Sequence, residues 1–150
     1  IHPGGAGSAP KLPIEKFKEL SIIINKKYQK QIVLTGSEDE CILANYITKS
    51  SHNVINLCGK TTLTELIAII HNSEGIISNS TGAIHIAASF NRRIIGFYPN
   101  SSNMNSTRWG PIADRTIILT PPNNNSEDMD NMELISMENI EKSFVELFIS

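Results

Sequence analysis

Apolar residues recur along the chain at a helical spacing in some segments and in short unbroken runs in others. Residues 13–28 show the helical spacing, with apolar positions at Ile14, Phe17, Leu20, Ile24 and Tyr28. Pro13 suits the first turn of a helix, because its missing N–H costs nothing there. Lysines occupy much of the rest of this segment. The pattern therefore predicts an amphipathic helix with one buried face.

Short unbroken apolar runs predict the buried strands. They cover residues 31–35, 54–57, 75–78, 93–98 and 116–119, and residues 1–2 have the character of the end of a sixth strand. Further helices are predicted over residues 38–50, 83–90 and 137–148. Another begins at Thr61 or Thr62, where Glu65 completes a capping box. Residues 99–115 are predicted to form a long polar loop.

The alternation of strand and helix predicts an α/β fold, a doubly wound parallel sheet of about six strands with helices on both faces. Ligands of such sheets bind outside the carboxyl ends of the strands. We therefore expect functional residues in the loops that follow the strands. These loops cover residues 3–12, 36–40, 58–62, 79–85 and 98–115.

Composition limits the class of protein. A chain of 150 residues with 40% hydrophobic residues suits one domain. The net charge of −2 argues against a nucleic-acid-binding protein. No apolar run is long enough to span a membrane, and no signal peptide opens the sequence. The start at Ile1 without Met is consistent with a fragment of a longer protein.

Cys41 and Cys58 are the only cysteines, and they form no close-spaced pair. They are too few for a zinc cluster or a disulfide scaffold, and we interpret them as two buried, reduced thiols in a cytosolic protein.

Two glycine-containing segments resemble phosphate-binding motifs but lack a required residue. A P-loop that ends at Gly59 would need another glycine at the position of Val54. A dinucleotide fingerprint that starts at Gly5 would need glycine at the position of Pro10. Neither motif is therefore assigned.

A stronger signal follows the strand at 75–78, where a turn opens a helix. Thr81 provides a hydroxyl at the cap, and Gly82 lets a ligand approach the backbone closely. The free amides and the positive dipole end of the helix attract anions, and His85 lies in the first turn. The segment predicts a phosphate or pyrophosphate site; the alternative is a capped helix with a satisfied histidine.

Two other loops add candidate binding residues. Lys11 follows a loop of small residues and could supply a mobile cation for a phosphate, or it could be an ordinary surface lysine. Glu40 could accept hydrogen bonds from a ribose, or it could be an acidic residue that the helix dipole favours. The residues alone leave both alternatives open.

Five short motifs in one order resemble the C-terminal half of glycosyltransferase family 9, the lipopolysaccharide heptosyltransferases. They are Ile1-His2-Pro3-Gly4-Gly5-Ala6-Gly7-Ser8 with Lys11, Val33-Leu34-Thr35-Gly36 with Glu38 and Glu40, Leu63-Thr64-Glu65-Leu66, Asn79-Ser80-Thr81-Gly82 with His85 and Ala87, and Arg108-Trp109-Gly110-Pro111. Each motif alone is weak, but the order and spacing are specific, and they span essentially the whole chain.

The resemblance implies a GT-B fold, two Rossmann-like halves, of which residues 1–150 are the C-terminal, donor-binding one. The donor is a nucleotide sugar, typically ADP-heptose. By the resemblance Ser8 and Lys11 contact the diphosphate, and Glu40 holds the ribose. Thr81 and Gly82 offer amides to the phosphates, with His85 close by. Ser80 stands where the family usually has Asp, whose carboxylate would meet hydroxyls of the donor sugar.

The implied reaction is inverting and needs neither a metal nor another cofactor. Lys11 and the helix amides would stabilise the leaving diphosphate. The catalytic base belongs to the N-terminal domain, which is absent here, so we expect this chain alone to bind the donor without turnover.

The resemblance also implies the partners and the location. The acceptor is the lipopolysaccharide core, and the N-terminal domain of the same enzyme is the other partner. The implied location is cytoplasmic, with a peripheral position at the inner membrane as the second option. A non-catalytic nucleotide-binding module and another GT-B enzyme, such as a nucleotide-sugar epimerase, remain alternatives. Arg108 and Trp109 could line the entrance for acceptor or donor, although a tryptophan in such a loop usually packs onto its domain.

Overall fold

The computed structural model describes residues 1–5, 7, 9–122 and 128–150 and has alternating helices and strands. The helices are α1 (Ile14–Tyr28), α2 (Cys41–Thr48), α3 (Leu63–Asn72), α4 (Gly82–Ser89), α5 (Ser106–Trp109) and α6 (Met137–Phe148). The strands are β1 (Ile32–Leu34), β2 (Val54–Asn56), β3 (Gly75–Asn79), β4 (Arg93–Phe97) and β5 (Thr116–Leu119). Short 3-10 turns lie at Glu38–Glu40 and Met132–Leu134.

The strands are parallel and form two groups that the start of the chain joins. β1 pairs with β2, and β4 lies between β3 and β5. The amide of His2 donates to the carbonyl oxygen of Ile77 at 2.9 Å, and the amide of Thr35 donates to that of Ile1 at 3.1 Å. Residues 1–2 therefore lie between β1 and β3, where strand order reverses. Such a switch point is the usual ligand site of doubly wound sheets.

Of the predicted sixth strand, residues 1–2, the described structure forms a single bridge, between His2 and Ser78. Pro3 follows directly and has no N–H to donate to a ladder, which ends the pairing there.

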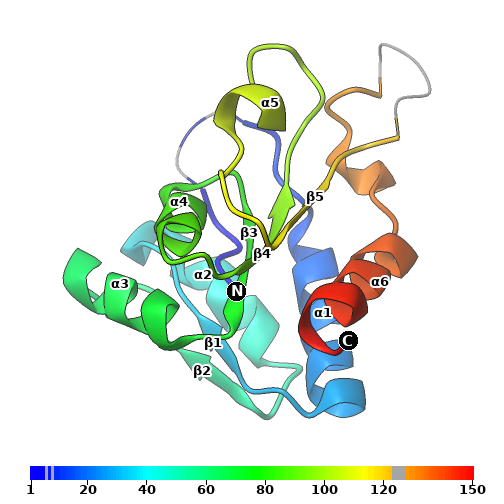
Figure 1. Ribbon diagram of the computed structural model, residues 1–150. Helices are drawn as coiled ribbons and strands as arrows, with labels where there is room; N and C mark the ends of the chain where they lie inside the picture. Colours follow the sequence, from blue (N-terminus) through cyan, green and yellow to red (C-terminus); the bar gives the residue numbers. More distant parts are fainter. Residues whose placement is uncertain (6, 8, 123–127) are drawn as a thin grey trace.

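Helices cover both faces of the sheet, as the sequence predicts (Figure 1). On one face α1 packs against α2 and α6, and Phe17 meets Phe97 of β4 edge to face at 5.5 Å. On the other face α3 packs against α4, with Ile70, Ile84 and Ile94 in one buried cluster. Apolar side chains of the helices thus cover both faces of the sheet. The loops that follow the strands lie at the carboxyl ends of the strands, where the helices do not cover the sheet.

Most element boundaries agree with the prediction, including the capping box of α3, in which the Glu65 amide donates to Thr62 Oγ1 at 3.3 Å. Two further differences occur. The predicted helix 38–50 begins with a 3-10 turn, and the polar loop 99–115 contains the short helix α5, capped by the side chain of Asn105. Within the described part of the chain, no helix combines the length and apolarity needed to cross a membrane.

Candidate functional site

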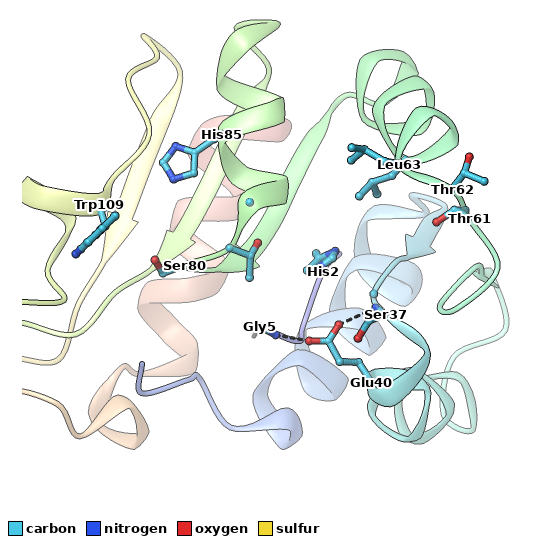
Figure 2. Close-up of a pocket in the computed structure, with 14 residues that line it drawn as sticks. His2, Gly5, Ser37, Glu40, Thr61, Thr62, Leu63, Ser80, His85 and Trp109 are labelled. Atoms are coloured by element: carbon cyan, nitrogen blue, oxygen red, sulfur yellow. Dashed lines mark hydrogen bonds between the residues drawn. The ribbon is translucent and has the colours of Figure 1, made fainter. Parts of the chain in front are cut away.

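A pocket of about 520 Å³ lies at the carboxyl ends of the strands, as the fold class predicts (Figure 2). It draws residues from each of the five loops expected to carry function. Its lining is His2, Gly5, Gly36, Ser37, Glu40, Thr61, Thr62, Leu63, Leu66, Ser80, Thr81, Gly82, His85 and Trp109. The volume suits a nucleotide-sized ligand.

Glu40 is held firmly at one side of this pocket, where Figure 2 shows its two backbone hydrogen bonds. The amide of Gly5 donates to Oε1 at 2.5 Å, and the amide of Ser37 donates to Oε2 at 2.8 Å. Glycines leave room for the carboxylate, because a Cβ on Gly4 would lie 2.1 Å from its Cδ. The side chain therefore joins the start of the chain to the loop after β1.

The carboxyl of Glu40 is ionised at neutral pH. Burial raises the pKa of this carboxyl. The hydrogen bonds from Ser37 and Gly5 and the nearby His2 lower the pKa by more than burial raises it, so the pKa is below the usual 4.5. A carboxylate has about four acceptor positions, and two amides use only part of that capacity. Glu40 can therefore still accept hydrogen bonds from hydroxyl groups in the pocket.

His2 lies between the two sides of the pocket, and sequence reasoning did not select it. Its Nδ1 is 3.0 Å from the hydroxyl of Thr35, which fixes the ring. Burial lowers its pKa, and the nearby Glu40 offsets part of that effect. His2 is therefore neutral at neutral pH. Its place at the end of a predicted strand was the signal available in the sequence.

The start of α4 forms the opposite side. Thr81 is the N-cap residue of α4, as predicted, but its Oγ1 lies 2.9 Å from Ser78 Oγ and makes no capping hydrogen bond. The first amides of a helix have no partner within it, and here the cap side chain supplies none either. Gly82 has open space where a Cβ would be, and the exposed ring of His85 points into the same pocket. This side offers uncapped N–H groups to a ligand.

Ser80 and Trp109 lie next to the start of α4 (Figure 2). Burial raises the pKa of the Tyr98 hydroxyl, and a hydrogen bond with the Ser80 side chain partly offsets it. The same hydroxyl donates to the carbonyl oxygen of Trp109 at 3.1 Å. Ser80 and α5 are thus both tied to Tyr98.

The expectation that Trp109 packs its loop onto the domain is wrong, since its side chain is 50% exposed and lines the pocket. Its Nε1 donates to the carbonyl oxygen of Asn103 at 2.8 Å. The guanidinium of Arg108 lies 5.4 Å from the ring centre. Arg108 itself does not line the pocket.

Lys11 lies beside the pocket rather than in it. Its exposed ammonium donates to the carbonyl oxygen of Gly7 at 3.3 Å. Its Cε and the Cγ2 of Thr81 would each lie 3.3 Å from a Cβ on Gly5, so the lysine stem borders the start of α4. Ser8, the other predicted diphosphate contact, lies outside the described residues.

The arrangement combines hydrogen-bond donors on one side with a carboxylate acceptor on the other. Uncapped amides suit an anionic group, and Glu40 suits hydroxyl groups. Leu63 and Leu66 add apolar surface from α3. Among the described residues, no three or more His, Cys, Asp or Glu side chains are grouped to hold a metal ion.

The chain is similar to bacterial glycosyltransferases in sequence. It is 32% identical over 154 residues to a Haemophilus influenzae protein named only as a glycosyltransferase, covering 93% of this chain and 41% of that protein. It is 32% identical over 102 residues to lipopolysaccharide heptosyltransferase 2 of Escherichia coli, covering 64% and 29%. The chain thus spans less than half the length of the curated relatives it matches.

Solved structures have the same fold. ADP-heptose LPS heptosyltransferase II of E. coli superposes with a TM-score of 0.81 at 23% identity, over 97% of this chain and 44% of that one. E. coli heptosyltransferase WaaC with ADP gives 0.79 at 18% identity, over 96% and 42%. The family model for glycosyltransferase family 9 (heptosyltransferase) matches residues 1–137. The chain therefore belongs to glycosyltransferase family 9, the heptosyltransferase family.

Proposed function

We propose that this chain is the donor-binding half of an inverting glycosyltransferase that uses an ADP-sugar, ADP-heptose in the first instance. The observation that carries the proposal is the uncapped start of α4 facing the clamped carboxylate of Glu40 across one pocket. This pairing suits a molecule that joins a diphosphate to a ribose. The E. coli WaaC structures, which contain ADP or ADP-2-deoxy-2-fluoro heptose, support the choice of nucleotide.

The proposed donor lies across the pocket with its diphosphate at the amides of Thr81 and Gly82. Lys11 reaches the phosphates from the edge. Ser8, which lies outside the described residues, is proposed as a second contact by resemblance. The ribose hydroxyls donate to Glu40, and the adenine ring lies against Leu63 and Leu66 of α3. The His85 ring lies beside the phosphates and can form a hydrogen bond on the α4 side of the pocket.

The sugar is proposed to meet Ser80. A serine is shorter than the aspartate usual in the family and carries no charge. The Ser80 side chain also has a hydrogen bond with the Tyr98 hydroxyl. It therefore holds a sugar hydroxyl less strongly than a carboxylate would. The presence of Ser80 therefore weakens the assignment of the sugar as heptose, whereas it does not bear on the identity of the nucleotide.

In the proposed reaction an acceptor hydroxyl attacks the anomeric carbon of the donor while the bond to the diphosphate oxygen breaks. The negative charge that grows on the leaving ADP is stabilised by the α4 amides and Lys11. The base that takes the acceptor proton belongs to an N-terminal domain of the same enzyme. The acceptor is the lipopolysaccharide core, met at the cytoplasmic side of the inner membrane. This chain alone is therefore expected to bind donor without turnover.

Calorimetric titration with ADP, UDP, GDP and CDP tests the proposal. We expect binding that is strongest for ADP and weaker in Lys11→Ala and Glu40→Ala, with Lys49→Ala as a matched surface control. Equal affinity for all four nucleotides would contradict the ADP assignment, and absence of binding would contradict the donor site. Sugar transfer by the isolated chain would show that the base is not in another domain.

A further inference from the structure

The two cysteines lie together in the fold, although they are 17 positions apart in sequence. Cys41 opens α2, and Cys58 follows β2. Cys58 Sγ donates to the carbonyl oxygen of Ser37 at 3.2 Å, and Cys41 Sγ lies 3.8 Å from the same oxygen. Cys41 Sγ also donates to the carbonyl oxygen of Cys58 at 3.2 Å. Both are free thiols, as the sequence predicts, but only Cys58 is buried and Cys41 is partly exposed.

Glycines make room for this pair. A Cβ on Gly36 would lie 2.8 Å from Cys58 Sγ, and a Cβ on Gly59 would lie 2.8 Å from Cys41 Sγ. Gly59 has φ +70°, a conformation that favours glycine, and its amide donates to the carbonyl oxygen of Gly36 at 2.9 Å. The loops after β1 and β2 are thus held side by side with a sulfur from each between them.

The two thiols differ in access. Cys41 is partly exposed, whereas Cys58 is 2% exposed. Burial, followed by the hydrogen bond with Cys41, raises the pKa of Cys58 to about 12. A reagent from solvent therefore meets Cys41 first. Cys58 is the neighbour of whatever forms on Cys41, because both sulfurs approach the Ser37 carbonyl oxygen. The raised pKa keeps Cys58 protonated at neutral pH, so we expect its reaction to be the slower of the two.

We propose that Cys41 and Cys58 form a dithiol site that small disulfide compounds, such as glutathione disulfide, convert to an intramolecular disulfide. Cys41 loses its proton and attacks one sulfur of the compound, which releases one thiol and leaves a mixed disulfide. Cys58 then loses its proton and attacks Cys41 Sγ, which releases the second thiol. The protein is oxidised by two electrons, and one disulfide compound is reduced to two thiols.

The disulfide would act on the neighbouring Glu40. It removes both thiol hydrogen bonds, including the one from Cys58 to the Ser37 carbonyl. The amide of that same Ser37 holds Oε2 of Glu40. Oxidation is therefore expected to disturb Glu40 and to lower the affinity for ADP several-fold. This consequence rests on the proposed function, whereas formation of the disulfide does not.

Intact-mass measurement tests the site directly. The folded chain is incubated with glutathione disulfide. At the end of the reaction we expect both thiols to be lost and the mass to be lower by two hydrogen atoms, and we expect dithiothreitol to reverse the change. Because the chain has only two cysteines, no other pairing within it is possible. Cys58→Ser should instead retain one glutathione on Cys41, and Cys41→Ser should react more slowly than the wild type.

Several results would overturn the dithiol site: a wild-type chain that keeps glutathione, one that joins to a second chain, or one that pairs its cysteines only in urea. Circular dichroism confirms that each variant is folded. ADP affinity is then compared between oxidised and reduced chain. An unchanged affinity would overturn the link to Glu40 alone, and a reduced chain without ADP binding would overturn the proposed function but not the dithiol site.

Discussion

The two sides of the pocket differ in how far their polar groups are already engaged. Both carboxylate oxygens of Glu40 accept backbone hydrogen bonds, from Gly5 and from Ser37. At the start of α4 the Thr81 hydroxyl is turned to Ser78 and caps nothing. On one side, the carboxylate of Glu40 is a hydrogen-bond acceptor held in place by the backbone. On the other side, the first amides of α4 are donors without a capping side chain. Under the proposed function, the acceptor side would bind a ribose and the donor side a diphosphate.

The largest expected effect comes from removing one donor at the start of α4. Gly82→Pro deletes the N–H at a position where helices accept proline, and Thr81 has the extended backbone, φ −140° and ψ 164°, that precedes proline readily. A hydrogen bond to a charged group contributes about 1.5–3 kcal/mol, so ADP affinity should fall about tenfold to a hundredfold, measured by calorimetry.

Gly82→Ala is the matched control, because it keeps the N–H and places its Cβ in open space. If both variants bind ADP as the wild type does, the α4 side takes no part in phosphate binding.

A smaller effect is expected on the Glu40 side. The wild type should prefer ADP to 2′,3′-dideoxy-ADP by about tenfold, the value of one charge-assisted hydrogen bond. Glu40→Gln should remove most of that preference, since an amide has one acceptor oxygen instead of two. Competition titration measures it, with Glu38→Gln as the neighbouring exposed control. A preference that survives in Glu40→Gln would mean that the ribose binds elsewhere.

Lys11 should contribute less, because its ammonium is exposed. Lys11→Ala is expected to weaken ADP binding about twofold to fivefold at low salt, as for an exposed ion pair. The difference should shrink when titrations are repeated at high salt, because salt screens exposed charges. A loss that does not depend on salt would indicate a buried role that the structure does not show.

The smallest effect is on stability and concerns pH. The folded-state pKa of Glu40 is lower than its usual 4.5, so its contribution to stability is complete above pH 4.5 and is lost as pH falls through the folded value. Urea unfolding at several pH values should therefore show the free energies of unfolding of the wild type and Glu40→Gln drawing closer as the pH falls below 4.5. Parallel curves would mean that the backbone hydrogen bonds do not favour the ionised form.

The sequence predicted the helices and strands well because their periods are set by local apolar spacing. α1 and α6 have the predicted bounds within a residue, and the capping box of α3 is present. The prediction was less accurate where a tertiary contact or a single turn determines the secondary structure. Pro3 reduces the first strand to one bridge, and α5 is a four-residue turn inside a polar loop.

The site was predictable at the level of loops and less so at the level of side chains. Parallel-sheet topology identified the loops that carry Glu40, Gly82 and His85, and all three line the pocket. The Gly5–Glu40 hydrogen bond needs residues 35 positions apart to meet, and the meeting of Cys41 with Cys58 needs two loops to align. No local pattern encodes either contact. Trp109 was misplaced because its exposure depends on how α5 sits over the pocket.

Amide nuclear magnetic resonance tests the division of the pocket most directly. Pyrophosphate and adenosine are titrated separately into the labelled chain. We predict that pyrophosphate shifts the amides of Gly82 and its neighbours in α4, that adenosine shifts those of Gly5 and Ser37, and that ADP shifts both sets. Pyrophosphate that shifts only the Glu40 side, or adenosine that shifts only α4, would contradict it.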